Sequence, residues 1–218
     1  MPTFSERLES TFATLVRPLT PEDGQPESDL SDAEARLGLT LPSVLREYYR
    51  LAGRYDRFNR AHHRLRGPER WSVEGGKLVF LEENQCVVVW GVDASNLPDD
   101  DPPVYRGQDV RGQPTEWYRE HERCSAFLLV MLHLQAVWGG YEHLGGSDIP
   151  PAALEKFLEG WTFAGRINEP RAYSREGGAA CVIDGEGSMQ LQVGGRTERD
   201  FEEMVDELEA IGVRLDQL

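Results

Sequence analysis

The stretch from Arg123 to Trp138 is apolar around almost the whole circumference of a helix, and this feature constrains the fold most. A helix of this kind is stable only when other elements cover it on nearly all sides. The pattern therefore predicts a helix buried at the centre of a layered domain. Its apolar residues are Ala126, Phe127, Leu128, Leu129, Val130, Met131, Leu132, Leu134 and Val137.

Two apolar runs before this helix predict a β-hairpin. They are Lys77–Leu81 and Cys86–Trp90, and the polar residues 82–85 between them indicate a reversal of the chain. Residues 87–89 are three consecutive valines, a pattern typical of a strand covered on both faces. Residues 102–105, which begin with two prolines, predict a short edge strand, because an edge tolerates proline best.

Capping patterns predict three helices near the N-terminus. Thr3 and Glu6 form a capping box before a helix whose apolar face ends at Leu15. A second box at residues 31–34 predicts a short helix through Leu37, which Gly38 ends. Pro42 suits the first turn of a third helix, and Gly53 lies where its C-terminal cap is expected.

The C-terminal part predicts a small sheet and one more helix. Residues 171–175, 179–183 and 189–193 have strand patterns, Thr197 is suited to cap an amphipathic helix that ends at Gly212, and Val213–Leu215 predicts a last strand. Paired glycines before residue 150 indicate a boundary there. We therefore expect an α+β protein: a mixed, mainly antiparallel sheet with flanking helices in residues 1–150, and an α+β extension in residues 151–218.

Composition predicts a soluble, cytoplasmic protein. Of 218 residues, 39% are hydrophobic and 28% are charged, which is typical of a folded globule. The longest apolar run, Ala126–Leu132, is too short to cross a membrane, and the first residues have no secretory signal. Three widely spaced cysteines argue against a disulfide framework. The net charge of −15 favours basic partners over nucleic acid.

One basic segment stands against this acidic background. Between Arg54 and Arg70 six arginines accompany two acidic residues, with Tyr55 and Phe58 interleaved. Such a patch can grip phosphates and stack a base. The surrounding acidic charge opposes that function, so the first interpretation is an exposed loop. The alternative is that these arginines pair with the protein's own carboxylates.

Catalytic and metal-binding patterns are weak. The chain has no nucleotide-binding glycine motif and no nucleophile elbow. His121 and Cys124 are spaced three apart and His62 adjoins His63, but neither pair belongs to a closed set of zinc ligands. We therefore expect no cofactor, no metal and no enzyme activity. The alternative is a small hydrolase or metal-dependent enzyme that uses residues 62–63, 99–101 and 121–124.

Two segments resemble the SUKH superfamily, which contains many bacterial immunity proteins. Residues 33–53 are similar to its opening, an acidic helix followed by Leu-Pro and a helix that ends in glycine, and residues 78–91 look like its central hairpin. The buried helix after Trp117 fits the family's later helix. The resemblance implies that Leu41, Pro42, Leu45, Trp90 and Gly91 determine the fold. It does not cover residues 151–218.

The resemblance also implies a non-enzymatic binder, in bacteria commonly an immunity protein that neutralises a toxin. Many such toxins are basic, and an acidic binder associates faster with a basic partner. Aromatic side chains beside a charged rim favour protein binding. The alternative is that these aromatics are core and the aspartates are merely solvated. The predicted partner-binding residues are Asp93, Asp99, Asp100, Asp101, Tyr105, Trp117 and Tyr118.

Overall fold

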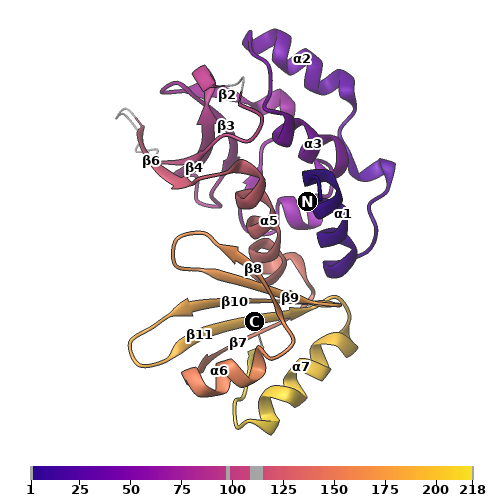
Figure 1. Ribbon diagram of the computed structural model, residues 1–218, viewed down its shortest axis with the longest axis vertical. Coiled ribbons are helices and arrows are strands. Elements are labelled where there is room, and N and C mark those ends of the chain that lie inside the picture. Colours follow the sequence, from indigo (N-terminus) through magenta and orange to yellow (C-terminus); the bar gives the residue numbers. More distant parts are fainter. Residues whose placement is uncertain (1, 97–98, 109–114, 218) are drawn as a thin grey trace. The chain divides into compact units, whose positions relative to one another are not determined.

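The computed structural model describes residues 2–96, 99–108 and 115–217 (Figure 1). Their contacts divide the chain into two compact units. The first contains Met1–Glu9 and Leu19–Leu128, and the second contains Ser10–Pro18 and Leu129–Leu218. The division falls inside two helices, α1 and α5, whereas the sequence indicated a boundary near residue 150. The described residues form seven α-helices and two antiparallel sheets, which confirms the α+β fold class.

The N-terminal helices follow the predicted caps with two shifts. Helix α1 (Phe4–Leu15) begins with the predicted box, in which Thr3 donates its N–H to Glu6 Oε2 at 2.7 Å. Helix α2 (Glu27–Leu37) begins right after Pro26, earlier than predicted, and ends at Gly38, whose φ is +66°. Helix α3 (Ser43–Ala52) begins one residue after Pro42. Pro42 is therefore the N-cap residue and not, as predicted, part of the first turn. A short α4 (Asp56–Asn59) follows.

The first sheet is built around the predicted hairpin. Strands β3 (Lys77–Glu82) and β4 (Val88–Asp93) pair antiparallel, which confirms that prediction, although Cys86 and Val87 lie in the exposed turn between them. The strand order is β1-β3-β4-β5-β6, and β2 also pairs with β3. The remaining bounds are β1 (Arg64–Leu65), β2 (Ser72–Glu74), β5 (Val104–Gln108) and β6 (Glu116–His121). Short 3₁₀ turns occur at Pro21–Asp23, Pro68–Arg70 and Ala94–Asn96.

The prediction that residues 102–105 form an edge strand is wrong about the edge position. Strand β5 pairs with β4 on one side and β6 on the other, so it lies inside the sheet. Both prolines precede the strand and remove no hydrogen bond from its ladder. Strand β6, which the sequence did not indicate, forms the edge instead.

The predicted buried helix is confirmed as α5 (Cys124–Gln135), which runs into a π-helical turn (Ala136–Gly140). In the first unit Phe127 of this helix packs edge-on against Phe80 of β3, with ring centroids 6.1 Å apart. In the second unit His133 is buried and its Nε2 lies 3.1 Å from the Ser174 hydroxyl. No helix in the described part of the chain is both long enough and apolar enough to cross a membrane.

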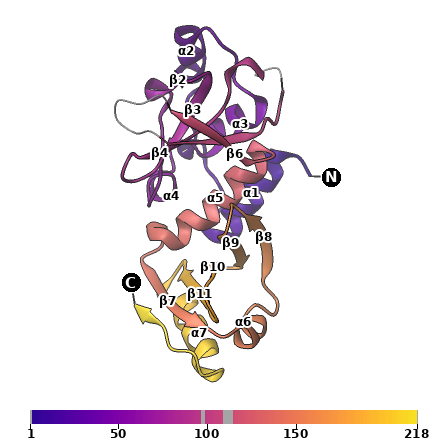
Figure 2. The ribbon, with the colours of Figure 1, turned by 90° about the vertical axis from the view of Figure 1, so that its left-hand side faces the viewer.

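The second sheet contains three of the four strands predicted in the C-terminal part at their expected positions, one that is shifted and two that were not predicted. Its order is β12-β7-β11-β10-β9-β8, and all its described pairings are antiparallel. The last strand, β12, lies at Asp216–Gln217 rather than 213–215 and pairs with β7 (Figure 2). The other bounds are β7 (His143–Ile149), β8 (Thr162–Arg166), β9 (Arg171–Arg175), β10 (Gly178–Asp184) and β11 (Met189–Gly195).

Two helices contribute to the core of the second unit. Helix α6 (Pro151–Phe157) was not predicted, whereas α7 (Glu198–Ala210) begins with a capping box at the predicted residue, Thr197. Their buried faces meet apolar side chains of β10 and β11 in one cluster, which includes Leu154, Phe157, Phe201, Met204 and Leu208. This packing fixes which face of α7 stays open to solvent.

Candidate functional site

The structure places three of the predicted partner-binding residues on one face of the first sheet. Tyr105 lies opposite Gly91 in the ladder, Asp93 is two residues beyond that glycine, and Trp117 lies opposite Gly107. The Lys77 ammonium stands 4.5 Å above the Tyr105 ring and 3.1 Å from the Asp93 carboxylate. The charges at this place therefore already compensate each other.

The other four predicted residues lie elsewhere. Tyr118 belongs to the opposite face of β6, is 51% exposed and donates its hydroxyl to Glu116. The Asp100 carbonyl accepts the Val44 N–H at the start of α3. Asp101 caps α5, because its carboxylate accepts the Ser125 N–H at 2.8 Å and the Ser125 hydroxyl at 2.7 Å. Asp99 is exposed, and its carboxylate accepts the Asp101 N–H at 3.1 Å. The seven residues thus form no single surface, and partner binding by them stays a prediction.

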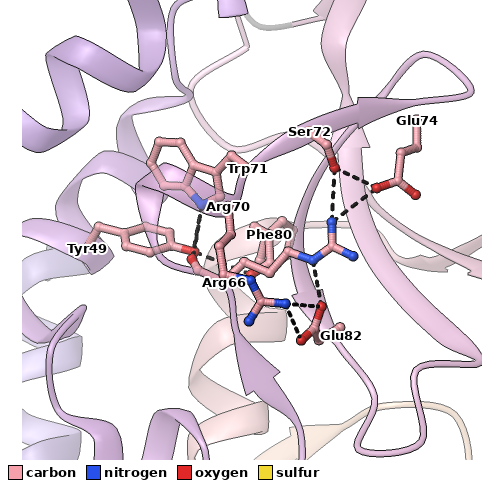
Figure 3. A network of polar contacts seen from close by, with 8 residues as sticks. All are labelled: Tyr49, Arg66, Arg70, Trp71, Ser72, Glu74, Phe80 and Glu82. Carbon is pink, nitrogen blue, oxygen red and sulfur yellow. Dashed lines mark hydrogen bonds and ion pairs between the residues drawn. The ribbon is translucent and has the colours of Figure 1, made fainter. Parts of the chain in front are cut away.

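Two side chains of the arginine-rich segment, Arg66 and Arg70, form ion pairs with the protein's own carboxylates (Figure 3). Arg66 donates from Nε to Glu82 at 2.8 Å and bonds Glu74 at 3.1 Å, while Arg70 bonds Glu82 at 2.9 Å. Burial alone would raise the pKa of Glu82, but the hydrogen bonds and charges of Arg66 and Arg70 outweigh it and lower that pKa. An exposed loop is therefore the wrong interpretation for this part of the segment.

An aromatic anchor holds the backbone beside that ion network. The Tyr49 hydroxyl donates to the Arg66 carbonyl at 2.6 Å, and the Trp71 indole N–H reaches the same tyrosine oxygen at 3.0 Å. Both rings are almost completely buried. Arg66 is thus fixed at its backbone and at its guanidinium, which gives it a structural role.

The histidines and the cysteine considered for catalysis lie in different local environments. His63 is buried against Trp90, and this burial, together with the charge of His62, lowers its pKa to about 4. Burial raises the pKa of the Cys124 thiol well above its usual value, and Asp101 adds to the effect. His121 contacts the backbone of Arg123. Across the described ranges, no three His, Cys, Asp or Glu side chains gather closely enough to hold a metal ion.

A groove lies in the second unit. It has a volume of about 580 Å³ and lies between the start of β7 and the N-terminal half of α7. Four carboxylates line it, together with an imidazole and three apolar side chains. The lining residues are Glu142, His143, Leu144, Glu198, Phe201, Glu202, Val205 and Asp206.

The helix wall of this groove carries a row of like charges. Glu198, Glu202 and Asp206 are spaced four apart, so they share one face of α7, and neighbours at this spacing repel each other. Within the described part of the chain, no lysine or arginine forms an ion pair with any of these three residues. The row is therefore uncompensated.

Acidic residues of the same region outside the groove do have basic partners. Glu207 pairs with Arg175 at 2.8 Å, Glu203 with Arg199 at 3.0 Å and Glu176 with Arg196 at 2.9 Å. The basic side chains are thus directed away from the groove. This arrangement leaves a concave, negatively charged surface that suits a cationic group.

The sequence contains part of the signal for this groove. The spacing of the three acidic residues on α7 is readable, because the helix itself was predicted. The opposite wall is not readable, because the paired glycines Gly145 and Gly146 of β7 indicate a boundary rather than a strand. Gly145 instead permits close packing: a Cβ there would lie 3.2 Å from Phe201 of α7.

Comparison of the chain with family models, with curated proteins and with solved structures gives no match.

Proposed function

We propose that this chain is a non-catalytic protein-binding module that takes a basic segment of its partner into the groove between β7 and α7. The observation that carries the proposal is the uncompensated row Glu198, Glu202 and Asp206, while Arg175, Arg196 and Arg199 pair with carboxylates outside the groove. A partner's cation would remove the repulsion within this row and gain attraction to several carboxylates.

The charge of the whole chain supports the same proposal. At −15, the protein attracts basic surfaces over about a Debye length, which speeds association with them. Two arginines of the largest basic cluster in the sequence, Arg66 and Arg70, are engaged with Glu74 and Glu82. Neutralisation of a basic toxin in the cytoplasm, which the SUKH resemblance implies, is one form of this function.

The test uses a blocked octapeptide that contains two arginines and two lysines separated by glycine. We expect the protein to bind it at low salt and the affinity to fall as salt rises. The triple variant E198Q/E202Q/D206N should bind roughly tenfold more weakly, because exposed charge pairs contribute only about 0.2–1 kcal/mol each. Isothermal titration calorimetry measures both affinities.

A matched variant separates the groove from the overall charge. E155Q/E159Q/E209Q changes the net charge by the same amount at exposed positions of the same unit that do not line the groove. It should keep most of the affinity. If both triple variants lose affinity equally, or if the unaltered protein does not bind the peptide at low salt, the proposed function is wrong.

A further inference from the structure

The groove has an aromatic wall as well as a charged one. His143 of β7 and Phe201 of α7 lie stacked, with ring centroids 6.5 Å apart and planes inclined by 27°. Both rings belong to the lining, and Phe201 is 94% buried by the packing of α7 on the sheet. His143 is only half-buried. The accessible ring is therefore that of His143, held in place by the fixed phenylalanine behind it.

Carboxylates from two segments of the chain line the groove together with these rings. Glu142 directly precedes β7, and Glu198 and Glu202 belong to α7 like Phe201. A ligand group that contacts the rings therefore lies near carboxylates from two segments of the chain, the start of β7 and helix α7. Flat apolar surface and several carboxylate acceptors occur together in this groove, and Leu144 and Val205 extend the apolar part.

These features discriminate between the two basic side chains of proteins. The guanidinium of arginine is planar, weakly hydrated and able to stack on a ring while its donors reach carboxylates in two directions. The ammonium of lysine is a compact, strongly hydrated charge that gains little from a flat wall. We infer that the groove is an arginine-binding site, selective for arginine over lysine in an extended segment of the partner. This inference rests on the proposed function and adds the identity of the recognised side chain.

The test compares three blocked heptapeptides in which glycine alternates with arginine, with lysine or with citrulline. Citrulline keeps the planar shape of arginine but has no charge. At pH 8 and low salt we expect the arginine peptide to bind at least about fivefold more tightly than the lysine peptide, and the citrulline peptide to bind most weakly. Chemical-shift perturbation measures the affinities and shows whether His143, Glu198 and Glu202 respond.

Two variants test the part played by the ring. H143A should reduce the affinity for the arginine peptide toward that for the lysine peptide and leave the lysine peptide almost unchanged. H143F, which restores a flat ring without the imidazole nitrogens, should recover the preference. The comparison on the unaltered protein decides the question even if H143A folds poorly.

The outcomes separate the two proposals. Equal binding of the arginine and lysine peptides, or tighter binding of lysine, overturns the arginine selectivity and leaves a groove for basic segments in place. An equal loss of both peptides in H143A also overturns the role of the ring. Failure of both charged peptides to bind overturns the proposed function itself.

Discussion

The Arg66 guanidinium donates its Nε–H to the Glu82 carboxylate at 2.8 Å, and only 5% of that glutamate side chain is exposed. Arg66 comes from the arginine-rich segment and Glu82 from the end of β3, so the bond joins that segment to the first sheet. A charge buried in this way is stable only while its partner remains. Glu82 is therefore vulnerable to the loss of its basic partner.

We predict that Arg66→Met lowers the free energy of unfolding by about 3–5 kcal/mol, because it leaves Glu82 buried with incomplete compensation. Arg70→Met should cost less than about 1 kcal/mol, since the Arg70 side chain is 49% exposed. Urea unfolding at pH 7 measures both values. Equal effects of the two substitutions would contradict the structural role of Arg66.

Acid should destabilise the first unit through His63. Its pKa is lowered to about 4 by burial and by His62, so the folded protein favours the neutral ring. The stability that this preference provides is complete above the ordinary pKa of histidine, about 6.5, and is lost as the pH falls toward 4. Between pH 7 and pH 5 we expect a loss of about 2 kcal/mol from this group.

Replacement of His63 by phenylalanine tests this pH dependence. The new ring keeps the contact with Trp90, whose centroid lies 4.8 Å from that of His63, but it cannot take up a proton. Urea unfolding curves at pH 7 and pH 5 should therefore move apart less in H63F than in the parent. An identical shift in both proteins would assign the acid sensitivity to other groups.

Asp101 should affect folding more than Asp99 does. Asp101→Ala removes the cap of α5 and should cost about 1–2 kcal/mol, whereas Asp99→Ala changes an exposed carboxylate and should cost less than about 0.5 kcal/mol. Thermal unfolding followed by circular dichroism measures both. A binding experiment that replaces all three aspartates together would thus combine a change of fold stability with any loss of contact.

Elements with a strong local period could be predicted from the sequence. Helix α5 is apolar on almost every side, α7 combines a capping residue with an amphipathic face, and β3 and β4 flank a short polar reversal. Each of these signals lies within one stretch of chain. Strand β7 has no such signal, because its glycines acquire their meaning only when β11, β12 and α7 pack against it.

The candidate site was harder to predict than the fold for the same reason. The groove needs two walls, and the sequence shows only the acidic row on α7. The pairing of Arg66 with Glu82 likewise joins residues that no short pattern connects. The sequence of the arginine-rich segment therefore allows either an exposed arginine patch or a network of ion pairs. The sequence does not distinguish Tyr105 from Tyr118, but the alternation of side chains along the strands places them on opposite faces of the sheet.

The acidic row on α7 predicts opposite stability effects at two adjacent residues. Glu202 stands between Glu198 and Asp206 at helical spacing, so Glu202→Gln removes two repulsions and should raise the free energy of unfolding by about 0.5 kcal/mol. Glu203→Gln instead breaks the ion pair with Arg199 at 3.0 Å and should lower it by about 0.3 kcal/mol. Urea unfolding at low salt measures both changes, and added salt should shrink both because it screens exposed charges.

The same two variants should differ in binding, since only Glu202 lines the groove: E202Q should weaken binding of the arginine peptide and E203Q should not. A gain in stability that accompanies a loss of binding is expected where a row of like charges is kept for a cationic ligand. Lower stability in E202Q would show that the row is already compensated, and unchanged binding would remove Glu202 from the site.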